Sequence, residues 1–293
     1  SGNAFSLVPG RGSCLLDVRF KGISVLDAYE TAEEVDFNRW AKNMPLFPFP
    51  NRLKEGRFSW KGKTYQFPVN DPQTGNALHG FGMDCEMVID KVTVEANQAT
   101  AITSFHYRGE KDHYPFPFEV FFSFRMRNPH DFEIKSSFVN RGKSNMPLGF
   151  GWHPYFRLSE EVGELSLKLP PLRWIGVDAD MIPTGKRYDY DAFLDKKPIG
   201  TEALDNCFAI PENTGMRTEV LLEGAGGQLK YWQENGGDKY NFIQLFTPPY
   251  RSSLAIEPMS CNIDAFNNGE GLIDLSPGEE ASARFGFSFT PDR

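Results

Sequence analysis

Apolar and polar residues alternate along much of the chain with a period of two, which is typical of β-strands that bury one face. Residues 92–96 and 101–107 alternate in this way on either side of a short polar turn, and so do residues 118–126 and 132–138. The second turn, Asn128-Pro129-His130-Asp131, has the residues that favour tight turns. Both segments therefore predict antiparallel hairpins.

Further strands are predicted where short apolar or alternating runs recur, at residues 165–169, 219–222, 229–232, 242–246, 254–256 and 283–289. No segment keeps helical spacing for three turns, although Glu30 to Ala41 and Asp189 to Asp195 are compatible with a turn or two of helix. A dozen or more strands without intervening helices predict an all-β fold, an antiparallel sandwich or barrel. We see no repeat or linker and expect one domain spanning residues 1–293.

Composition supports the β prediction and excludes several classes of protein. The 293 residues are 40% hydrophobic and 24% charged, which excludes wholesale disorder, and 14% aromatics with 27 Gly and 21 Pro suit short strands joined by turns. A net charge of -8 argues against a nucleic-acid partner. No apolar run approaches the roughly 18 residues of a membrane helix, so we expect no membrane partner.

The cysteines and the N-terminus suggest a compartment. Cys14, Cys85, Cys207 and Cys261 are widely separated and form no Cys-x-x-Cys pair, which favours buried free thiols over two disulfides. Residues 1–12 lack the basic and apolar regions of a signal peptide. We therefore expect a cytoplasmic protein.

Common catalytic motifs are missing from the sequence. Gly224-Ala225-Gly226-Gly227 follows an apolar strand, but the residues after it alternate like another strand, so a glycine-rich hairpin is predicted rather than a dinucleotide site. No Gly-x-Ser-x-Gly, P-loop or His-Glu-x-x-His motif occurs. His106, His113 and His130 share no face, and we predict no metal site.

Glu257 and His153 are titratable residues in strongly apolar surroundings. Glu257 ends an apolar strand before Pro258, where desolvation raises a carboxyl pKa toward the value that a general base needs near neutral pH. His153 lies among Trp152, Pro154 and aromatic residues and could exchange protons near neutrality. Taken singly, each also fits a structural role, an ion pair for Glu257 and a hydrogen-bonded core residue for His153.

Three further residues can likewise be interpreted either as residues of a functional site or as purely structural residues. His79 lies between Leu78 and Gly80, Arg52 follows a proline-rich loop, and Asp205 precedes Asn206 in a possible Asx-turn. A core histidine, a loop charge and a turn residue are the simpler interpretations when each is considered alone.

Taken together, these sequence motifs, in this order and at these separations, resemble the aldose 1-epimerase, or galactose mutarotase, family from about residue 50 to the C-terminus. The matching motifs are Asn51-Arg52, Leu78-His79-Gly80, His153-Pro154-Tyr155-Phe156, Asp205, Glu257-Pro258 and the tail from Asp264-Ala265-Phe266-Asn267 through Leu275-x-Pro277-Gly278-Glu279. One departure is Phe81, where the family often has a second glycine after Leu-His-Gly. This departure bears on which sugar is preferred.

The resemblance implies a large antiparallel β-supersandwich, an isomerase activity on an aldohexose and no metal or organic cofactor. It assigns the general-base role to Glu257 and the general-acid role to His153. Asn51, Arg52, His79, Asp205 and Gln244 would bind the sugar. The expected partner is a small sugar of carbohydrate metabolism, and we expect a monomer or weak homodimer.

Three rival functions stay open on the sequence. A hexose-6-phosphate 1-epimerase would place further cations beside the cleft, and Arg57, Arg108 and Arg141 are available. A non-catalytic carbohydrate-binding β-sandwich would bind sugar without accelerating anomer exchange. A polysaccharide lyase or glycoside hydrolase on a similar sandwich would require a Tyr/His pair or a second carboxylate near Glu257, for which Asp205 is the candidate.

Overall fold

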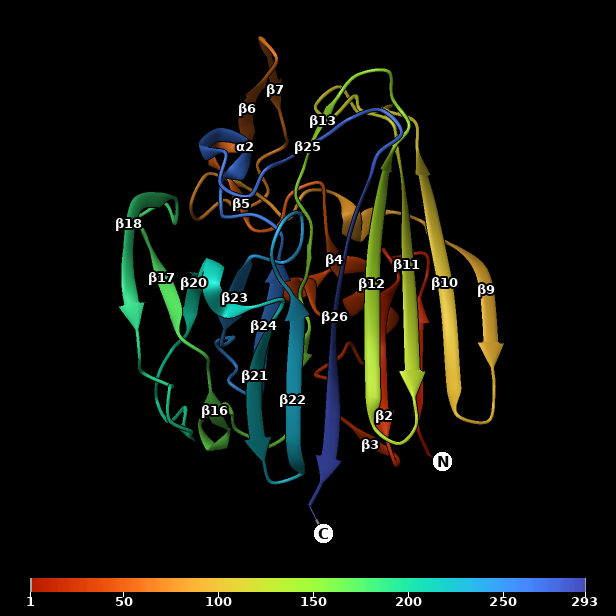
Figure 1. The fold of residues 1–293 in the computed structure, drawn as a ribbon, viewed down its shortest axis with the longest axis vertical. Helices are drawn as coiled ribbons and strands as arrows, with labels where there is room; N and C mark the ends of the chain where they lie inside the picture. The colour runs from red at the N-terminus through yellow and green to blue at the C-terminus, as the bar shows by residue number, and fades with distance from the viewer. Residues whose placement is uncertain (1, 293) are drawn as a thin grey trace.

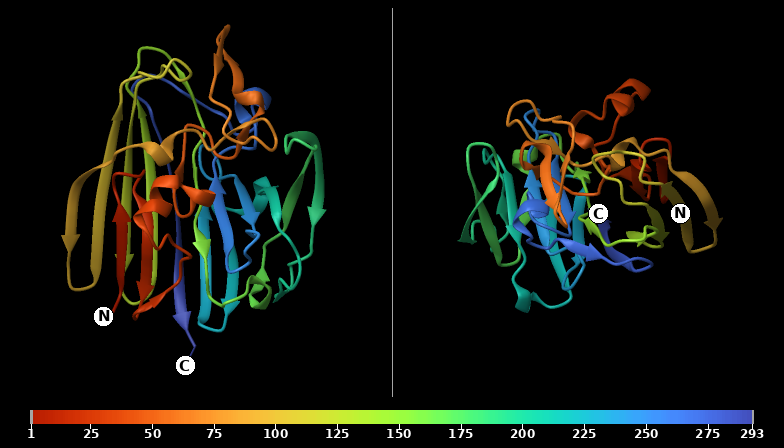
Figure 2. Two further views of the ribbon diagram at one scale, coloured as in Figure 1. Left: turned by 180° about the vertical axis from the view of Figure 1, so that it is seen from behind. Right: turned by 90° about the horizontal axis from the view of Figure 1, so that it is seen from above.

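The computed structural model describes residues 2–292, and β-structure dominates them. Two large antiparallel sheets lie one behind the other in Figure 1, and a small N-terminal sheet lies beside the second of them when seen from behind in Figure 2. The described part of the chain is thus an antiparallel sandwich, as the alternation predicts. Within it, no helix combines the length and the apolar character needed to cross a bilayer.

The larger sheet has nine strands joined in antiparallel order. From one edge to the other they are β19 (Lys197–Pro198), β16 (Ser166–Lys168), β21 (Arg217–Gly224), β22 (Gly227–Glu234), β26 (Glu280–Pro291), β12 (Asp131–Asn140), β11 (Phe118–Arg127), β10 (Gln98–Tyr107) and β9 (Val88–Val94).

The second sheet has eight strands and carries most of the chemically interesting residues. Its order is β18 (Pro183–Tyr190), β17 (Leu172–Val177), β20 (Asp205–Ala209), β23 (Phe242–Phe246), β24 (Leu254–Met259), β14 (Gly151–Trp152) and β4 (Pro45–Leu46), and β15 (Tyr155–Phe156) also pairs with β24.

The remaining elements are short. The small sheets are β1 (Ala4–Val8), β2 (Cys14–Phe20) and β3 (Ile23–Ser24); β5 (Arg52–Leu53) with β8 (Ala77–Leu78); β6 (Arg57–Trp60) with β7 (Lys63–Gln66); and β13 (Met146–Leu148) with β25 (Ile273–Leu275). The helices are α1 (Ala32–Phe37) and α2 (Ala265–Asn268), and the 3₁₀ turns are η1 (Arg39–Ala41), η2 (Lys54–Gly56), η3 (Gly82–Asp84), η4 (Val162–Glu164) and η5 (Glu212–Thr214).

The predicted hairpins are confirmed. β9 pairs with β10 and β11 pairs with β12 over most of their length, and Gly224 faces Gly227 at the tip of the β21–β22 hairpin. The segment from Glu30 to Ala41 contains α1 and η1. A capping box between Thr31 and Glu34 starts α1.

The helical expectation for Asp189 to Asp195 is wrong. Asp189 and Tyr190 end β18 and pair with β17, and the amide of Leu194 then donates to the carbonyl of Asp191 (3.1 Å) in a turn. Only Phe193 of this segment is buried, so no apolar stripe exists that could hold a helix against the sheet.

Between the sheets lies an aromatic core. On β11 the residues Phe118, Val120, Phe122 and Phe124 are fully buried and alternate with half-buried neighbours, as the period of two predicts. Trp152 packs against Phe122 (ring centroids 5.0 Å apart). Its indole N–H donates to the Ser136 hydroxyl (2.9 Å). The cysteines are free and buried, as expected.

Candidate active site

Neighbouring strands of the eight-stranded sheet present polar side chains on the face turned away from the core. Gln244 of β23 lies directly opposite Glu257 of β24, while Leu245 and Ile256 point into the core. Asp205 of β20 lies opposite Phe246, which is two residues beyond Gln244 on the same face. Side chains on one face of a strand repeat every second residue, which is about 6.8 Å. This face therefore has one row that contains Gln244 and Glu257 and a second row, about 6.8 Å along the strands, that contains Asp205 and Phe246.

His153 brings its imidazole to the carboxyl group of Glu257. It occupies the connection between β14 and β15, and its Nε2 lies 3.3 Å from Oε1 of Glu257. Tyr155 stacks flat on the imidazole, with ring centroids 4.8 Å apart and planes 4° apart. The two residues that the sequence singled out, 104 positions apart, therefore meet in one buried contact.

Burial shifts the pKa values of this pair in opposite directions. Desolvation, followed by the charge of Asp205, raises the pKa of Glu257 well above its usual value, while Arg52 opposes the shift. Desolvation lowers the pKa of His153 to about 3. Both shifts favour the uncharged forms, and hence a pair that holds a single proton near neutral pH.

Each member of the pair also has a polar atom without a hydrogen-bond partner among the described residues. These atoms are Nδ1 of His153 and Oε2 of Glu257, and both are buried. Buried polar atoms are nearly always hydrogen-bonded in folded proteins, and exceptions are frequent at functional sites. The carboxyl oxygen is therefore available to a hydroxyl group of a ligand.

His79 is held next to this pair by a reciprocal contact with Asn51. The Asn51 amide donates to Nδ1 of His79 (3.1 Å), and the His79 amide donates to the Asn51 carbonyl (2.9 Å). Because Nδ1 accepts, the proton of the neutral ring lies on Nε2. Burial, then His153 and Arg52, lower the pKa of His79 well below its usual value, so this ring is a neutral donor.

A chain of amide and carboxylate groups links the loops to the sheet. The Asn51 side chain donates to Oε1 of Gln244 (3.3 Å), and Nε2 of Gln244 donates to Oδ1 of Asp205 (2.7 Å). Asp205 is more exposed than Asn51 or Gln244, yet its carboxyl group lies close enough to the buried cluster for desolvation to raise its pKa. Together with the half-buried Arg52, it marks the side from which solvent reaches the cluster.

Arg52 is oriented by a residue that the sequence did not reveal. Its Nε donates to Oδ2 of Asp71 (3.0 Å), and the same oxygen accepts from the Thr74 hydroxyl (2.7 Å). Burial would raise the pKa of Asp71, but the hydrogen bonds from Thr74 and Arg52 lower it overall. Asp71 therefore stays ionised and fixes the guanidinium, which leaves nitrogen donors of Arg52 for a ligand.

An aromatic wall continues from the pair along the sheet face, and we define it as Trp40, Phe246 and Tyr250. The Phe246 ring meets the His153 ring edge-on (6.4 Å), and Trp40 lies 6.0 Å from Phe246 and 6.3 Å from Tyr250 between ring centroids. The Tyr155 hydroxyl donates to the Trp40 carbonyl (2.9 Å), which ties the wall to the ring beneath His153. Trp40 was not predicted, because its neighbours form no motif.

Asp27 holds together the two segments that supply this wall. It accepts from the Lys42 ammonium (2.8 Å), the Tyr250 hydroxyl (2.8 Å) and the Ser253 hydroxyl (2.6 Å). A nearly buried carboxylate with three donors is well satisfied. The contacts of Asp27 thus fix Tyr250 and the segment that carries Trp40. A cavity of about 280 Å³ lies beside Trp40 and Tyr250.

The structure therefore brings all seven predicted site residues into one connected cluster. The arginines considered for a phosphate do not join it: Arg141 pairs with Glu119, and neither Arg57 nor Arg108 has an ion pair or side-chain hydrogen bond to the cluster within the described chain. His106 is exposed beside Glu119, away from the cluster.

Comparison with known proteins agrees with this architecture. A galactose mutarotase-like protein from Clostridium acetobutylicum superposes with a TM-score of 0.86 at 19% identity, covering 99% of this chain and 93% of that one. The galactose 1-epimerase of Lactobacillus acidophilus superposes with a TM-score of 0.83 at 17% identity, covering 100% and 92%. The fold is galactose mutarotase-like.

The sequence comparisons define the family. The family model described as aldose 1-epimerase matches residues 4–288. A relative of uncharacterized function from Escherichia coli K12, YihR, is 27% identical over 279 residues, which covers 92% of this chain and 84% of the relative. The chain belongs to the aldose 1-epimerase family.

Proposed function

We propose that the protein is an aldose 1-epimerase that interconverts the α and β anomers of an aldohexose. The observation that carries this proposal is the buried contact of 3.3 Å between Nε2 of His153 and Oε1 of Glu257. Ring opening of a hemiacetal removes a proton from the C1 hydroxyl and adds one to the ring oxygen. Both oxygens are bonded to C1, so the two proton-transfer groups must lie close together, as these do.

In this mechanism Glu257 takes the proton from the C1 hydroxyl while His153 donates to the ring oxygen. The C1–O bond to the ring oxygen breaks and the free aldehyde forms. Rotation about the C1–C2 bond and reversal of both transfers close the other anomer. The pair carries one proton throughout, because the proton that Glu257 gains equals the one that His153 gives up.

Burial of the pair favours the open-chain stage of this cycle. Before ring opening the reactive arrangement is a carboxylate beside an imidazolium, whereas after it the carboxyl and the imidazole are both uncharged. Desolvation favours the uncharged arrangement. Since burial holds the resting proton on Glu257, the reactive arrangement is reached when that proton passes to His153 across their 3.3 Å contact, and ring opening then returns the pair to its uncharged form.

The surrounding residues suit a sugar ring. Arg52 and the Nε2–H of His79 can donate to sugar oxygens, and Asp205 can accept from hydroxyls. The aromatic wall supplies apolar surface next to the catalytic pair for the C–H face of the pyranose. In this proposal the protein works with its own side chains as acid and base.

Polarimetry on a freshly dissolved α-aldohexose tests the proposal. The protein should accelerate the change in optical rotation, and Glu257→Gln and His153→Gln should each reduce that acceleration by about 10²–10⁴-fold, the usual contribution of a positioned acid or base. His106→Gln, a change at an exposed histidine, is the matched control and should leave the rate unchanged.

Two outcomes would contradict the assignment. Sugar binding without any acceleration would indicate a carbohydrate-binding sandwich. Release of new reducing ends from an oligosaccharide, with loss of that activity in Asp205→Asn, would indicate a glycoside hydrolase that uses two carboxylates.

A further inference from the structure

The strand β9 exposes apolar side chains along one edge of the nine-stranded sheet. Val88, Ile89, Val92 and Val94 are 53–79% exposed, and they are four of the eleven large apolar or aromatic residues that the described chain exposes. β9 pairs with β10 on one side and, among the described residues, with no strand on the other. It lies at the margin of the molecule in Figures 1 and 2. An edge of this kind presents unpaired backbone groups on which another chain can add a strand.

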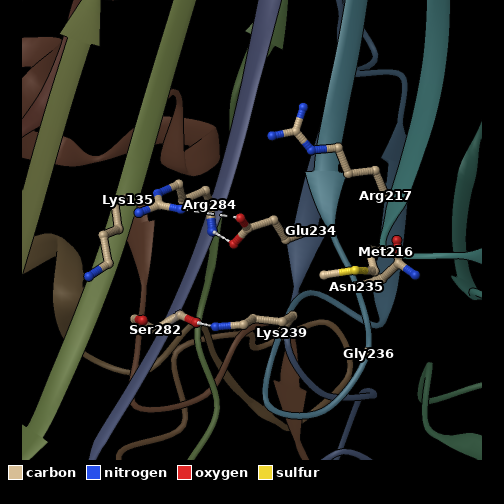
Figure 3. A pocket seen from close by; sticks show the side chains of 9 residues that line it. All are labelled: Lys135, Met216, Arg217, Glu234, Asn235, Gly236, Lys239, Ser282 and Arg284. Carbon is tan, nitrogen blue, oxygen red and sulfur yellow. Dashed lines mark hydrogen bonds and ion pairs between the residues drawn. The ribbon is translucent and has the colours of Figure 1, made fainter.

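Two other sheet edges are protected against such pairing by their sequence. β19, at the far edge of the same sheet, consists only of Lys197–Pro198, and β18, at the edge of the second sheet, exposes Lys186. Short length, lysine and proline are the usual protections of an edge strand. In the middle of the nine-stranded sheet, Lys135, Glu234 and Arg284 line a pocket and are all charged (Figure 3). The apolar exposure of β9 is therefore a local feature of this edge.

Ile89 and Val92 point to the inner face of the sheet, although both are exposed. Ile89 lies opposite Thr103 of β10, and Val92 lies opposite Ala101. Both β10 residues are buried. Since residues directly opposite each other share a face, Ile89 and Val92 extend the apolar inner surface of the sheet to its edge, where nothing in the described chain covers them.

A β-bulge turns two consecutive charged residues to the outer face. Lys91 lies opposite Ile102, and the register then skips Asp90, which is the extra residue of the bulge. Asp90 accepts a hydrogen bond from the Ser104 hydroxyl (3.0 Å). Ile102 and Ser104 alternate with the buried residues of β10, so Asp90 and Lys91 both lie on the outer face. Along residues 88–93 the faces are therefore outer, inner, outer, outer, inner, outer.

This order of faces is the same in both directions, so an antiparallel copy of β9 matches it about a two-fold axis between Asp90 and Lys91. That register places Ile89 of each copy opposite Val92 of the other on the inner face, and Asp90 opposite Lys91 twice on the outer face. A register shifted by one residue would place Asp90 opposite Asp90 or Lys91 opposite Lys91, and like charges directly opposite each other destabilise a sheet. The strand is therefore complementary to itself in one register.

We propose that β9 is the interface of a two-fold dimer of this chain, in which the β9 strands of two copies pair antiparallel about an axis between residues 90 and 91. The two nine-stranded sheets then continue into each other, which is the geometry of strand addition at a sheet edge. The same patch serves both copies, as a two-fold interface requires. The proposal goes beyond the proposed function and does not depend on it, because β9 and Glu257 belong to different sheets.

Sedimentation velocity of the full chain at low salt and several protein concentrations tests the proposal. The wild type should show a concentration-dependent equilibrium between monomer and dimer. Asp90→Lys and Lys91→Asp each place like charges opposite each other at two positions, so each should raise the dissociation constant of the dimer about tenfold or more. Asp90→Lys combined with Lys91→Asp restores opposite charges and should dimerise like the wild type.

A mixture of the two single variants tests the register directly. In Asp90→Lys both positions are cationic, and in Lys91→Asp both are anionic, so each variant repels itself and attracts the other. The mixture should form a dimer at a concentration at which neither variant alone does. A mixture that stays monomeric at concentrations where the wild type is dimeric would overturn the proposal.

The apolar inner face has its own variant. Val92→Lys places a charge opposite Ile89 of the other copy and should raise the dissociation constant by a similar factor. Val69→Lys changes a valine outside β9 that is 50% exposed, and this matched control should dimerise like the wild type. The proposal is overturned if the wild type is monomeric at every concentration, or if Asp90→Lys and Val92→Lys dimerise as tightly as the wild type.

Discussion

At the scale of the residue, the proton shared by Glu257 and His153 is the central feature of the site. Burial raises the pKa of the carboxyl group and lowers the pKa of the imidazole to about 3. The pair therefore holds one proton between these two pKa values. Below the lower value both groups are protonated and the base is lost; above the higher value neither is protonated and the acid is lost.

The pH profile of mutarotation follows from this proton count. We expect the enzymatic rate to stay level across neutral pH, to fall toward acid as pH approaches about 3, and to fall toward alkali above the raised pKa of Glu257. Rates from polarimetry, corrected for the uncatalysed reaction at each pH, check this. A step near pH 6.5, as for an unperturbed histidine, would contradict it.

Asp71 is expected to act through Arg52. In Asp71→Asn the guanidinium loses its charged partner, so the KM for the sugar should rise about tenfold while kcat changes less, since proton transfer does not involve Arg52. Steady-state mutarotation kinetics check this. Asp90→Asn, at an exposed aspartate of β9 that accepts a hydrogen bond from the Ser104 hydroxyl (3.0 Å), is the control and should leave both constants unchanged.

The sequence predicted the polar residues of the cluster better than it predicted their supports. Glu257, His153 and His79 lie in distinctive apolar or glycine-containing motifs. Asp71 and Trp40 do not, because a residue that orients another across space needs no particular neighbours in the sequence. Their contacts depend on loops that meet only in the folded chain.

At the scale of the element, the loop after β8 depends on Gly80. Its φ is +65°, and a Cβ at this position would lie 2.2 Å from the Phe47 carbonyl oxygen, closer than any real contact allows. The glycine lets the chain pass against Phe47 directly after His79. The loop that carries His79 can therefore adopt this conformation only because residue 80 is a glycine, which has no Cβ.

Gly80→Ala should displace this loop and lower both stability and mutarotase activity. Gly75→Ala is the matched control, because Gly75 has a similar φ of +73° but no atom within 4 Å of an added Cβ. We expect the control to lose about 1 kcal/mol from the left-handed conformation alone and Gly80→Ala to lose clearly more. Denaturant unfolding measures both; equal losses would show that the close approach is unimportant.

The aromatic wall gives a prediction for the segment after α1. Trp40→Ala removes the ring that lies over Phe246, so the KM for the sugar should rise several-fold to tenfold, with a smaller effect on kcat. Phe37→Ala changes an aromatic residue of the same segment that is 74% exposed, and it should have no effect. The comparison by polarimetry separates loss of stacking from a general effect on the segment.

At the scale of the whole molecule, alternation predicted the fold class and the local hairpins but not the order of strands. β12 pairs with β26, and β20 pairs with β23, across long stretches of intervening chain. Such pairings depend on which apolar strand faces pack together when the chain folds. The alternating pattern of a strand is compatible with many partner strands, so it does not predict which strand will pair with it. The supersandwich itself came from the family resemblance.

The buried thiols give a prediction for the intact fold. Cys14, Cys85, Cys207 and Cys261 are each at most 5% exposed, and burial raises their pKa values, so few thiolates form. The native protein should react slowly with a thiol reagent and reveal four thiols on unfolding, with or without reductant. Rapid labelling of the native protein would contradict this.

The alternation of β23 and β24 between the core and the face that carries Gln244 and Glu257 has a consequence for how the proposed substrate preference can diverge. Every second residue of these strands belongs to the packing of the sandwich, so the strands tolerate little change. Asn51, Asp71 and His79 come instead from loops, Trp40 from the 3₁₀ turn η1 and Arg52 from the two-residue strand β5, all outside these two strands. Mutant libraries aimed at a new sugar specificity are therefore best confined to these connecting segments, where substitutions do not disturb the packing of the sandwich.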